Sequence, residues 1–404
     1  MDMSVVERIK AGMAFERGRE APPPGFPALP LIPGGRYTDP GFLALEEQAI
    51  WKRSWFYLAH TGEVPAPGSY VLRRQTGAPI IIVRGRDNVI RAFYNSCKHR
   101  GAPVVREDSG ETRGFTCGYH GWTYDLDGRL VNLRDRRDFV DLDLACHGLT
   151  PVRCETFGSW IFVNEDPQAA PLIETLGPLA GELAQFQPES LVLVDSRAYP
   201  VACNVKVLLD AFLEVYHLKS IHQNTVDRFL DHRGTTITLW PGGHSRMTTP
   251  NRRPEWRDPG TIGMPEIPTV GEIARDNNVS YHIFPNIVMP PAPTGMPMLC
   301  FWPTGPRSMV IECHWFSPPF GPEGRLPLWD TRIRNFERIL EEDTQFAPQI
   351  QESLESPGFR GMTLNYQERR IQHWHEELDR RIGADRIPVQ LRVPPVLADW
   401  VERT

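Results

Sequence analysis

Two short segments of the chain each place a cysteine close to a histidine. Cys97 precedes His99 by two residues, Cys117 precedes His120 by three, and 17 residues lie between the two pairs. A cysteine thiolate is a soft ligand that donates charge to a metal, whereas a neutral imidazole binds through one nitrogen and keeps a ring N–H free. Glycine and proline residues beside both pairs permit tight loops. The two segments therefore predict one metal site shared between two loops.

The ligand set of this site is compatible with two kinds of metal centre. Two cysteines and two histidines hold a Rieske [2Fe–2S] cluster, in which the thiolates bind one iron and the imidazoles bind the other. The alternative is a structural zinc site, but such sites usually place both cysteines in one segment and both histidines in the other. Because each segment here is mixed, we predict a Rieske cluster bound by Cys97, His99, Cys117 and His120.

A second group of metal-binding residue types occurs at Glu214, His217 and His222. Glu214 and His217 are three residues apart, a spacing that places both on one face of a helix. His222 follows His217 by five residues, about 140° further round an ideal helix, so a regular helix cannot direct both rings at one metal. We therefore expect the helix to widen to π geometry or to end between the two histidines.

Two imidazoles need an anionic third ligand to bind Fe(II), and a two-histidine, one-carboxylate face leaves positions open for dioxygen and substrate. Asp343 is the candidate, because apolar residues at positions 336, 339 and 340 share its stripe on a predicted helix over 328–346. A carboxylate that continues an apolar stripe is expected to face the protein interior. Glu341 and Glu342 lie off this stripe and are expected to face solvent. The two histidines and Asp343 are thus predicted to bind one mononuclear iron.

Length, charge and cysteine usage limit the class of protein. The 404 residues suggest two domains of about 100–250 residues each. A net charge of −6 argues against nucleic acid as the main partner. The chain has no apolar run of about 18 residues, which argues against a membrane span, and its charged N-terminus lacks the apolar core of a signal peptide. The five cysteines outside the metal site have no disulfide-framework spacing, so we expect a cytoplasmic protein.

The residue pattern changes twice along the chain and predicts three regions. Residues 1–55 contain an N-terminal arm with helices, 56–166 form a β domain around the two metal-binding loops, and 167–404 form a larger α+β domain. Strands in the β domain are expected at 69–73, 79–83, 89–94 and 160–164. The last region begins with a linker helix over 169–186 that Pro178 breaks. Its strands are expected at 197–201, 235–240, 279–284, 298–302 and 309–316, and its helices at 204–220, 328–346 and 363–383.

Several motifs together resemble a known family. They are CKHRG at 97–101, CGYHGWTYDLDG at 117–128, the Glu214-x2-His217-x4-His222 pattern, and EED followed by IQESLES. With their surroundings, from RYTDPGFLALEEQAIWKRSWFYLAH onward, they make nearly the whole chain similar to the α subunit of the Rieske non-heme iron oxygenases, the ring-hydroxylating oxygenase family. The resemblance implies an α+β fold with an N-terminal Rieske [2Fe–2S] β-sandwich domain. It also implies a C-terminal catalytic domain of the helix-grip (START/Bet v1-like) type that holds mononuclear Fe(II).

The resemblance also gives roles to individual acidic residues. Most ring-hydroxylating members have Asp where this chain has Glu214, and a Glu is typical of the branch that includes the carnitine and glycine betaine monooxygenases, which are homotrimers. In that arrangement Glu214 links a cluster histidine of one subunit, here His120, to His217 of the next. Asp210, one helical turn before Glu214, is expected to shape access to the iron or to deliver protons.

The implied function is that of a terminal oxygenase component. It would use dioxygen and two electrons from a separate reductase or ferredoxin to hydroxylate an aromatic or other hydrophobic small molecule, as in the catabolism of aromatic hydrocarbons. The chain has no GxGxxG motif, so NAD(P)H is expected to act only through the reductase. Alternatives are oxidative N- or O-demethylation or C–N cleavage, including that of quaternary ammonium compounds, an electron-transfer Rieske protein without catalysis, and a ligand-binding protein.

The sequence leaves the substrate, the number of oxygen atoms inserted, the electron donor and the presence of a small β subunit open. Apolar residues near the second metal motif or on the strands of the last region are the candidates for a substrate pocket. They are Leu208, Phe212, Ile283, Phe284, Ile287, Met289 and Trp302.

Overall fold

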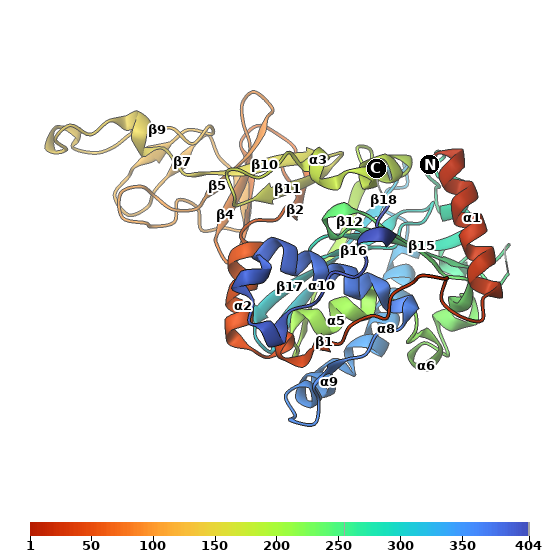
Figure 1. Ribbon diagram of the computed structural model, residues 1–404. Helices are drawn as coiled ribbons and strands as arrows, with labels where there is room; N and C mark the ends of the chain where they lie inside the picture. The colour runs from red at the N-terminus through yellow and green to blue at the C-terminus, as the bar shows by residue number, and fades with distance from the viewer. Residues whose placement is uncertain (254, 403–404) are drawn as a thin grey trace. The chain divides into compact units, whose positions relative to one another are not determined.

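The computed structural model describes residues 1–253 and 255–402, and the chain divides into two compact units (Figure 1). The small unit is Trp51–Thr175, and the large unit joins Met1–Ile50 to Leu176–Thr404. The N-terminal arm therefore packs with the C-terminal half of the chain. Each unit has its own antiparallel sheet, which agrees with the predicted α+β fold class.

The small unit is built on a seven-stranded sheet in the order β2-β11-β10-β5-β4-β3-β6. It also contains a separate three-stranded sheet in the order β7-β8-β9. Runs such as Ile80–Arg84 are buried on both faces, because branched apolar side chains fill the space on each side of the strand. The predicted strands at 69–73 and 160–164 match two of these elements. Strands β2 to β11 are, in this order, Phe56–His60, Ser69–Arg73, Ile80–Arg84, Ile90–Tyr94, Ser109–Glu111, Phe115–Thr116, Thr123–Tyr124, Leu130–Asn132, Pro151–Phe157 and Trp160–Asn164.

The large unit is built on a second seven-stranded antiparallel sheet in the order β12-β18-β17-β16-β15-β14-β13. Long helices pack with this sheet, and α10 is fixed to it by a hydrogen bond from the Trp374 indole N–H to the Pro285 carbonyl at 2.9 Å. The strands are Val192–Val201, Thr236–Leu239, Ser245–Pro250, Asn277–Ile283, Ile287–Met289, Met296–Gly305 and Ser308–Ser317 for β12 to β18. The helices include Met3–Gly18 (α1), Pro40–Glu46 (α2), Val205–Phe212 (α5), Leu218–Ile221 (α6), Leu328–Thr344 (α8), Ala347–Leu354 (α9) and Arg369–Ile382 (α10).

The helix predicted over 204–220 is two helices. Helix α5 ends at Phe212, and the short helix α6 begins at Leu218 and ends at Ile221. A helix therefore ends between the two histidines, as expected, and an additional break lies before His217. The carboxylate of Glu214 accepts the backbone N–H groups of Tyr216 and His217, and this gives those donors a partner outside a helix. The linker over 169–186 is likewise broken, into Leu172–Leu176 (α3) and Pro178–Leu183 (α4), at the proline that predicted the break.

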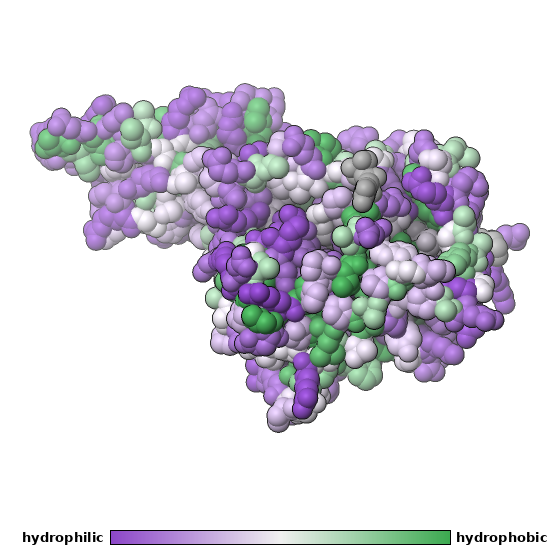
Figure 2. Space-filling model, viewed as in Figure 1, coloured by the Kyte–Doolittle hydropathy of each residue, from purple (hydrophilic) through white to green (hydrophobic). Residues whose placement is uncertain are grey.

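Within residues 1–253 and 255–402, no helix is both long enough and apolar enough to cross a bilayer. Exposed hydrophobic side chains occur in the small unit at Val131 and Val140. Figure 2 shows hydrophobic groups at the outer end of the segment that follows β9, surrounded by hydrophilic ones. Such isolated groups are normal on a protein surface.

Candidate metal centres and the adjoining cavity

The two loops predicted to hold a cluster have the same backbone hydrogen bonds. In each loop the cysteine carbonyl accepts the N–H of the glycine four residues later, Gly101 after Cys97 and Gly121 after Cys117, at 2.9 Å. Both glycines have positive φ, 72° and 76°, a conformation that a side chain would disfavour. The cysteine N–H in turn donates to the carbonyl of residue 102 or 122. Two equivalent tight turns therefore present the four predicted ligands.

The side chains of these loops converge. The Nδ1 atoms of His99 and His120 lie 3.0 Å apart, and the Trp122 ring stacks on His99 with centroids 5.1 Å apart and planes 6° from parallel. Burial lowers the pKa of His99, and nearby His120 and Arg100 lower it further, which favours the neutral imidazole that a metal requires.

The cysteines suit a metal cluster by their burial and by their lack of a disulfide. Cys97 and Cys117 are 3% and 2% exposed in the apolar core of the small unit, and neither is oxidised to a disulfide. The Tyr124 hydroxyl lies 3.3 Å from Cys97 Sγ, close enough to donate to a thiolate. Two buried thiols and two converging imidazoles fit a Rieske cluster, in which the thiolates would bind one iron and the imidazoles the other.

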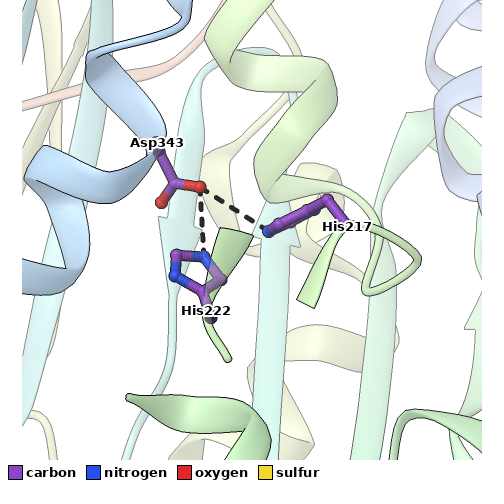
Figure 3. Close-up of side chains that lie close together, drawn as sticks. All are labelled: His217, His222 and Asp343. Atoms are coloured by element: carbon purple, nitrogen blue, oxygen red, sulfur yellow. Dashed lines mark ion pairs between the residues drawn. The ribbon is translucent and has the colours of Figure 1, made fainter. Parts of the chain in front are cut away.

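The second group of predicted ligands also comes together, in the large unit (Figure 3). Asp343 on α8 directs Oδ1 toward both imidazoles, 3.1 Å from His222 Nε2 and 3.6 Å from His217 Nε2. One ligand atom from each of the three residues lies within 4.8 Å of the others. Asp343 Oδ1 is buried and has no hydrogen-bond donor among the described residues. A buried carboxylate oxygen facing two nitrogens fits a metal ion held by two histidines and one carboxylate.

Carboxylates also hold the other nitrogen of each imidazole. His217 Nδ1 contacts Glu214 Oε1, and His222 Nδ1 lies 2.6 Å from Glu342 Oε2. Each contact places a proton on Nδ1 and leaves Nε2 free for a metal. Burial lowers the pKa of both histidines, but these carboxylates and Asp343 raise it by more, so each pKa is raised overall.

The expectation that Glu342 faces solvent is wrong. Its side chain is 24% exposed, and Oε2 also accepts the Thr225 hydroxyl at 2.6 Å. The stripe on α8 correctly separated Asp343 from its neighbours, but periodicity along one helix carries no information about the segment that packs beside it. The sequence signal that was missed is that Glu342 directly precedes the predicted ligand Asp343. An acidic residue in that position can reach the imidazole of another ligand, here His222.

A cavity of about 350 Å³ adjoins this group, within the usual size of a small-molecule site. Its wall includes Glu214, His217, His222 and Asp343. Aromatic side chains supply much of the apolar remainder: Phe212, Phe229, Trp256, Trp315 and Phe336. The cavity can therefore bring an apolar molecule next to the three converging ligand atoms.

Of the predicted pocket residues, the structure brings only Phe212 to the cavity. The others are buried in the core and do not occur among the described residues of its wall: Leu208, Ile283, Phe284, Ile287, Met289 and Trp302. Successive side chains on a strand point to opposite faces of the sheet. Val288 and Leu299 line the cavity, so Ile287, Met289 and Trp302 face away from it. Apolar composition located the right strands without giving the face.

Asp210 lies outside the cavity wall, in a buried polar network with the N-terminal segment. Its Oδ2 accepts the Tyr37 hydroxyl at 2.5 Å, and that hydroxyl lies 3.1 Å from His375 Nε2. Burial raises the pKa of Asp210 to about 7, although the Tyr37 hydrogen bond and the charges of Lys206 and Arg36 act to lower it. A role for Asp210 in iron access or proton delivery stays a prediction.

Comparison with known proteins gives matches to both units. The family model described as the Rieske [2Fe–2S] domain matches residues 54–147, and the model described as the ring hydroxylating alpha subunit (catalytic domain) matches residues 188–384. These two domains imply a Rieske [2Fe–2S] cluster and a mononuclear iron as cofactors, which agrees with both ligand sets.

Individual relatives include both monooxygenases and dioxygenases. The chain is 34% identical over 198 residues to the carnitine monooxygenase oxygenase subunit of Escherichia coli (strain K12), covering 48% of this chain and 53% of that protein. The chain thus spans about half the length of that relative. It is 27% identical over 402 residues to toluate 1,2-dioxygenase subunit alpha of Pseudomonas putida, covering 90% of this chain and 86% of that protein.

A solved structure confirms the architecture. The quaternary ammonium Rieske monooxygenase CntA, in complex with L-carnitine, aligns with a TM-score of 0.73 at 23% identity, covering 87% of this chain and 94% of that chain. This likeness concerns the fold. The family resemblance and the predicted fold class are confirmed, and the chain belongs to the Rieske oxygenases, with a Rieske domain followed by a ring-hydroxylating alpha-subunit catalytic domain.

Proposed function

We propose that the protein is the terminal component of a Rieske-type oxygenase that hydroxylates an apolar small molecule. The observation that carries this proposal is the group of His217, His222 and Asp343 in the wall of a largely apolar cavity. An iron ion held there would supply dioxygen activation, and the Rieske cluster would supply electrons. The chain's own residues hold the ligands in orientation, exclude water and position the substrate.

In this proposal Cys97, His99, Cys117 and His120 bind the cluster, and the two histidines with Asp343 bind the iron. Glu214 is proposed to orient His217 and to couple it to the cluster of a neighbouring subunit in a homotrimer. Inter-subunit electron transfer is described for a solved quaternary ammonium Rieske monooxygenase. A separate reductase or ferredoxin is the proposed electron donor.

A second candidate activity is oxidative demethylation or C–N cleavage, including that of a quaternary ammonium compound. The aromatic side chains in the cavity wall support it, because aromatic faces attract a cationic ammonium group. The relative at 34% identity is named a carnitine monooxygenase. Formaldehyde released in step with oxygen consumption would favour demethylation, whereas a hydroxylated product without formaldehyde would favour hydroxylation.

The first test is composition followed by one substitution. We expect three irons and two acid-labile sulfides per chain, with a Rieske-type EPR signal after reduction. In Glu214→Gln the cluster should still assemble and accept electrons, while substrate-dependent oxygen consumption should collapse. Glu352→Gln, the same change at an exposed position on α9, should behave as wild type. Two irons per chain after reconstitution with iron, or full coupled activity in Glu214→Gln, would contradict the proposal.

A further inference from the structure

One face of helix α8 forms a continuous part of the cavity wall. Residues 332, 335, 336, 339 and 343 recur at helical spacing, and all of them line the cavity. Asp343 follows Arg332 by eleven positions, close to three helical turns, so both lie on the same face about 16 Å apart along the axis. The wall therefore has a carboxylate of the metal group toward one end and a guanidinium toward the other.

Among the described residues, the hydrogen-bond partners of the Arg332 guanidinium are all neutral. Its Nη1 donates to the carbonyl and the hydroxyl of Thr294, both at 3.1 Å, and its Nη2 donates to the Gly295 carbonyl at 3.0 Å. These bonds and the Trp329 ring, 4.7 Å from the guanidinium carbon, fix its position. A guanidinium has five N–H donors, so Nε–H and one Nη2–H are left for a ligand.

The other arginines of the cavity wall already have acidic partners. Arg257 donates to Asp276 at 2.8 Å, and Arg275 is paired with Glu266. Arg332 forms no ion pair with any residue in 1–253 or 255–402, and Asp258 acts on it only from a longer distance. Burial lowers the pKa of Arg332 to about 10, so it remains protonated at neutral pH. The wall thus contains a partly buried positive charge that forms no ion pair with a described residue, an arrangement that an anionic ligand would stabilise.

We propose that Arg332 binds a carboxylate group of the substrate, so that the cavity selects molecules with an apolar body and an acid at one end. This inference rests on the proposed function, because it takes the cavity beside the metal group as the substrate site. The spacing along α8 sets the carboxylate on the order of 10 Å or more from the carbon that reacts. Trp315 and Phe336, in edge-to-face contact at 5.9 Å, lie on the wall to contact the apolar body.

The test is the affinity of an acid compared with its neutral amide. The probes are 8-phenyloctanoic acid and 8-phenyloctanamide, titrated by calorimetry into the intact holoprotein without oxygen, together with shorter phenylalkanoic acids. We expect wild type to bind the long acid at least about tenfold more tightly than the amide. Arg332→Gln should lose about 10- to 100-fold in affinity for the acid and little for the amide. Arg332→Lys keeps the charge but not the planar pair of donors, and should recover part of that loss.

Arg338→Gln is the matched control. Arg338 lies on the same helix and is exposed, and it does not occur among the described residues of the cavity wall. The control removes the same charge from α8 and should keep the preference of wild type for the acid. Equal loss in Arg338→Gln and Arg332→Gln, or an unchanged preference in Arg332→Gln, would overturn the inference. The inference would also be overturned if the wild-type protein bound acid and amide equally, or bound no acid of the series. These two results do not depend on how a variant folds.

Because binding is measured without turnover, the two proposals can fail separately. If the preference for the acid depends on Arg332 but the reduced protein consumes no oxygen with any of the probes, the result would support the proposed anion site and contradict the proposed oxygenase activity. If oxygen consumption is coupled to product formation but acid and amide bind with equal affinity, the result would support the oxygenase activity and overturn the anion site.

Discussion

The contact between Glu342 and His222 offers a direct test of how the protein orients its proposed metal ligands. Glu342 Oε2 lies 2.6 Å from His222 Nδ1, on the opposite side of the ring from Nε2, which faces Asp343. Because the carboxylate holds the proton on Nδ1, the lone pair of Nε2 is available for iron. Removing this carboxylate should therefore weaken iron binding without removing a ligand.

The expected magnitude differs between two substitutions. In Glu342→Gln an oxygen acceptor remains but the charge is lost, and charge-assisted hydrogen bonds are about twice as strong as neutral ones. We expect the dissociation constant for Fe(II) to rise about tenfold, about 1.4 kcal/mol. Glu342→Ala also removes the acceptor of Thr225, and we expect a loss of about 100-fold, the upper end for outer partners of metal ligands.

The assay is an anaerobic competition titration of Fe(II) between the protein, with its cluster intact, and a chelator of known affinity. Glu341→Gln is the control, because it removes the same charge one residue away from an exposed side chain. It should bind iron as wild type does. If Glu342→Ala bound iron within twofold of wild type, or if Glu341→Gln lost as much affinity as Glu342→Gln, a directed hydrogen bond would not be the cause.

Three further predictions concern the cluster and the buried charges. Cys97→Ser should lose the cluster, with about one iron per chain left and no acid-labile sulfide, whereas Cys146→Ser at an exposed position should keep all three irons. Lys206→Met breaks a fully buried ion pair with Glu46 at 2.6 Å and should lower the free energy of unfolding in urea by about 3–5 kcal/mol, while the double change with Glu46→Leu should recover most of it. Asp210 has a folded pKa raised to about 7, so its contribution to stability is present below pH 4 and lost as pH rises through 7. The advantage of wild type over Asp210→Asn in unfolding free energy should therefore fall with pH across this window, by about 4 kcal/mol at most, and a constant difference would contradict the burial argument.

The sequence predicted those features that depend on residue type and local spacing. The cluster loops were predicted from their mixed Cys/His pairs, and four strands of the small unit were predicted from short β-rich runs, at 69–73, 79–83, 89–94 and 160–164. The remaining strands of that unit, several of them only two or three residues long, were not predicted. The helix end between the two histidines was predicted, but the earlier break between α5 and α6 was not. At that break the Glu214 side chain accepts two backbone N–H groups, an interaction that neither helix periodicity nor composition encodes. Most of the residues predicted for the pocket do not line the cavity, for a similar reason. Alternation of side chains assigns two faces to a strand but does not say which face meets the cavity.

The residues that the sequence did not single out contact residues that are distant from them in the sequence. Glu342 meets His222 and Arg332 meets Thr294, pairs separated by 120 and 38 residues, and both come from α8, the helix whose stripe pointed to Asp343. In these proposals one helix supplies a metal ligand, the carboxylate that orients a second ligand, and the cation that would bind the acid of a substrate. Because a helix is rigid over this length, the distance between the acid of a substrate and the carbon that reacts would be set by α8 itself. Shortening the acid probe should then weaken turnover more than binding, since the carboxylate would stay on Arg332 while the carbon to be oxidised is drawn away from His217 and His222.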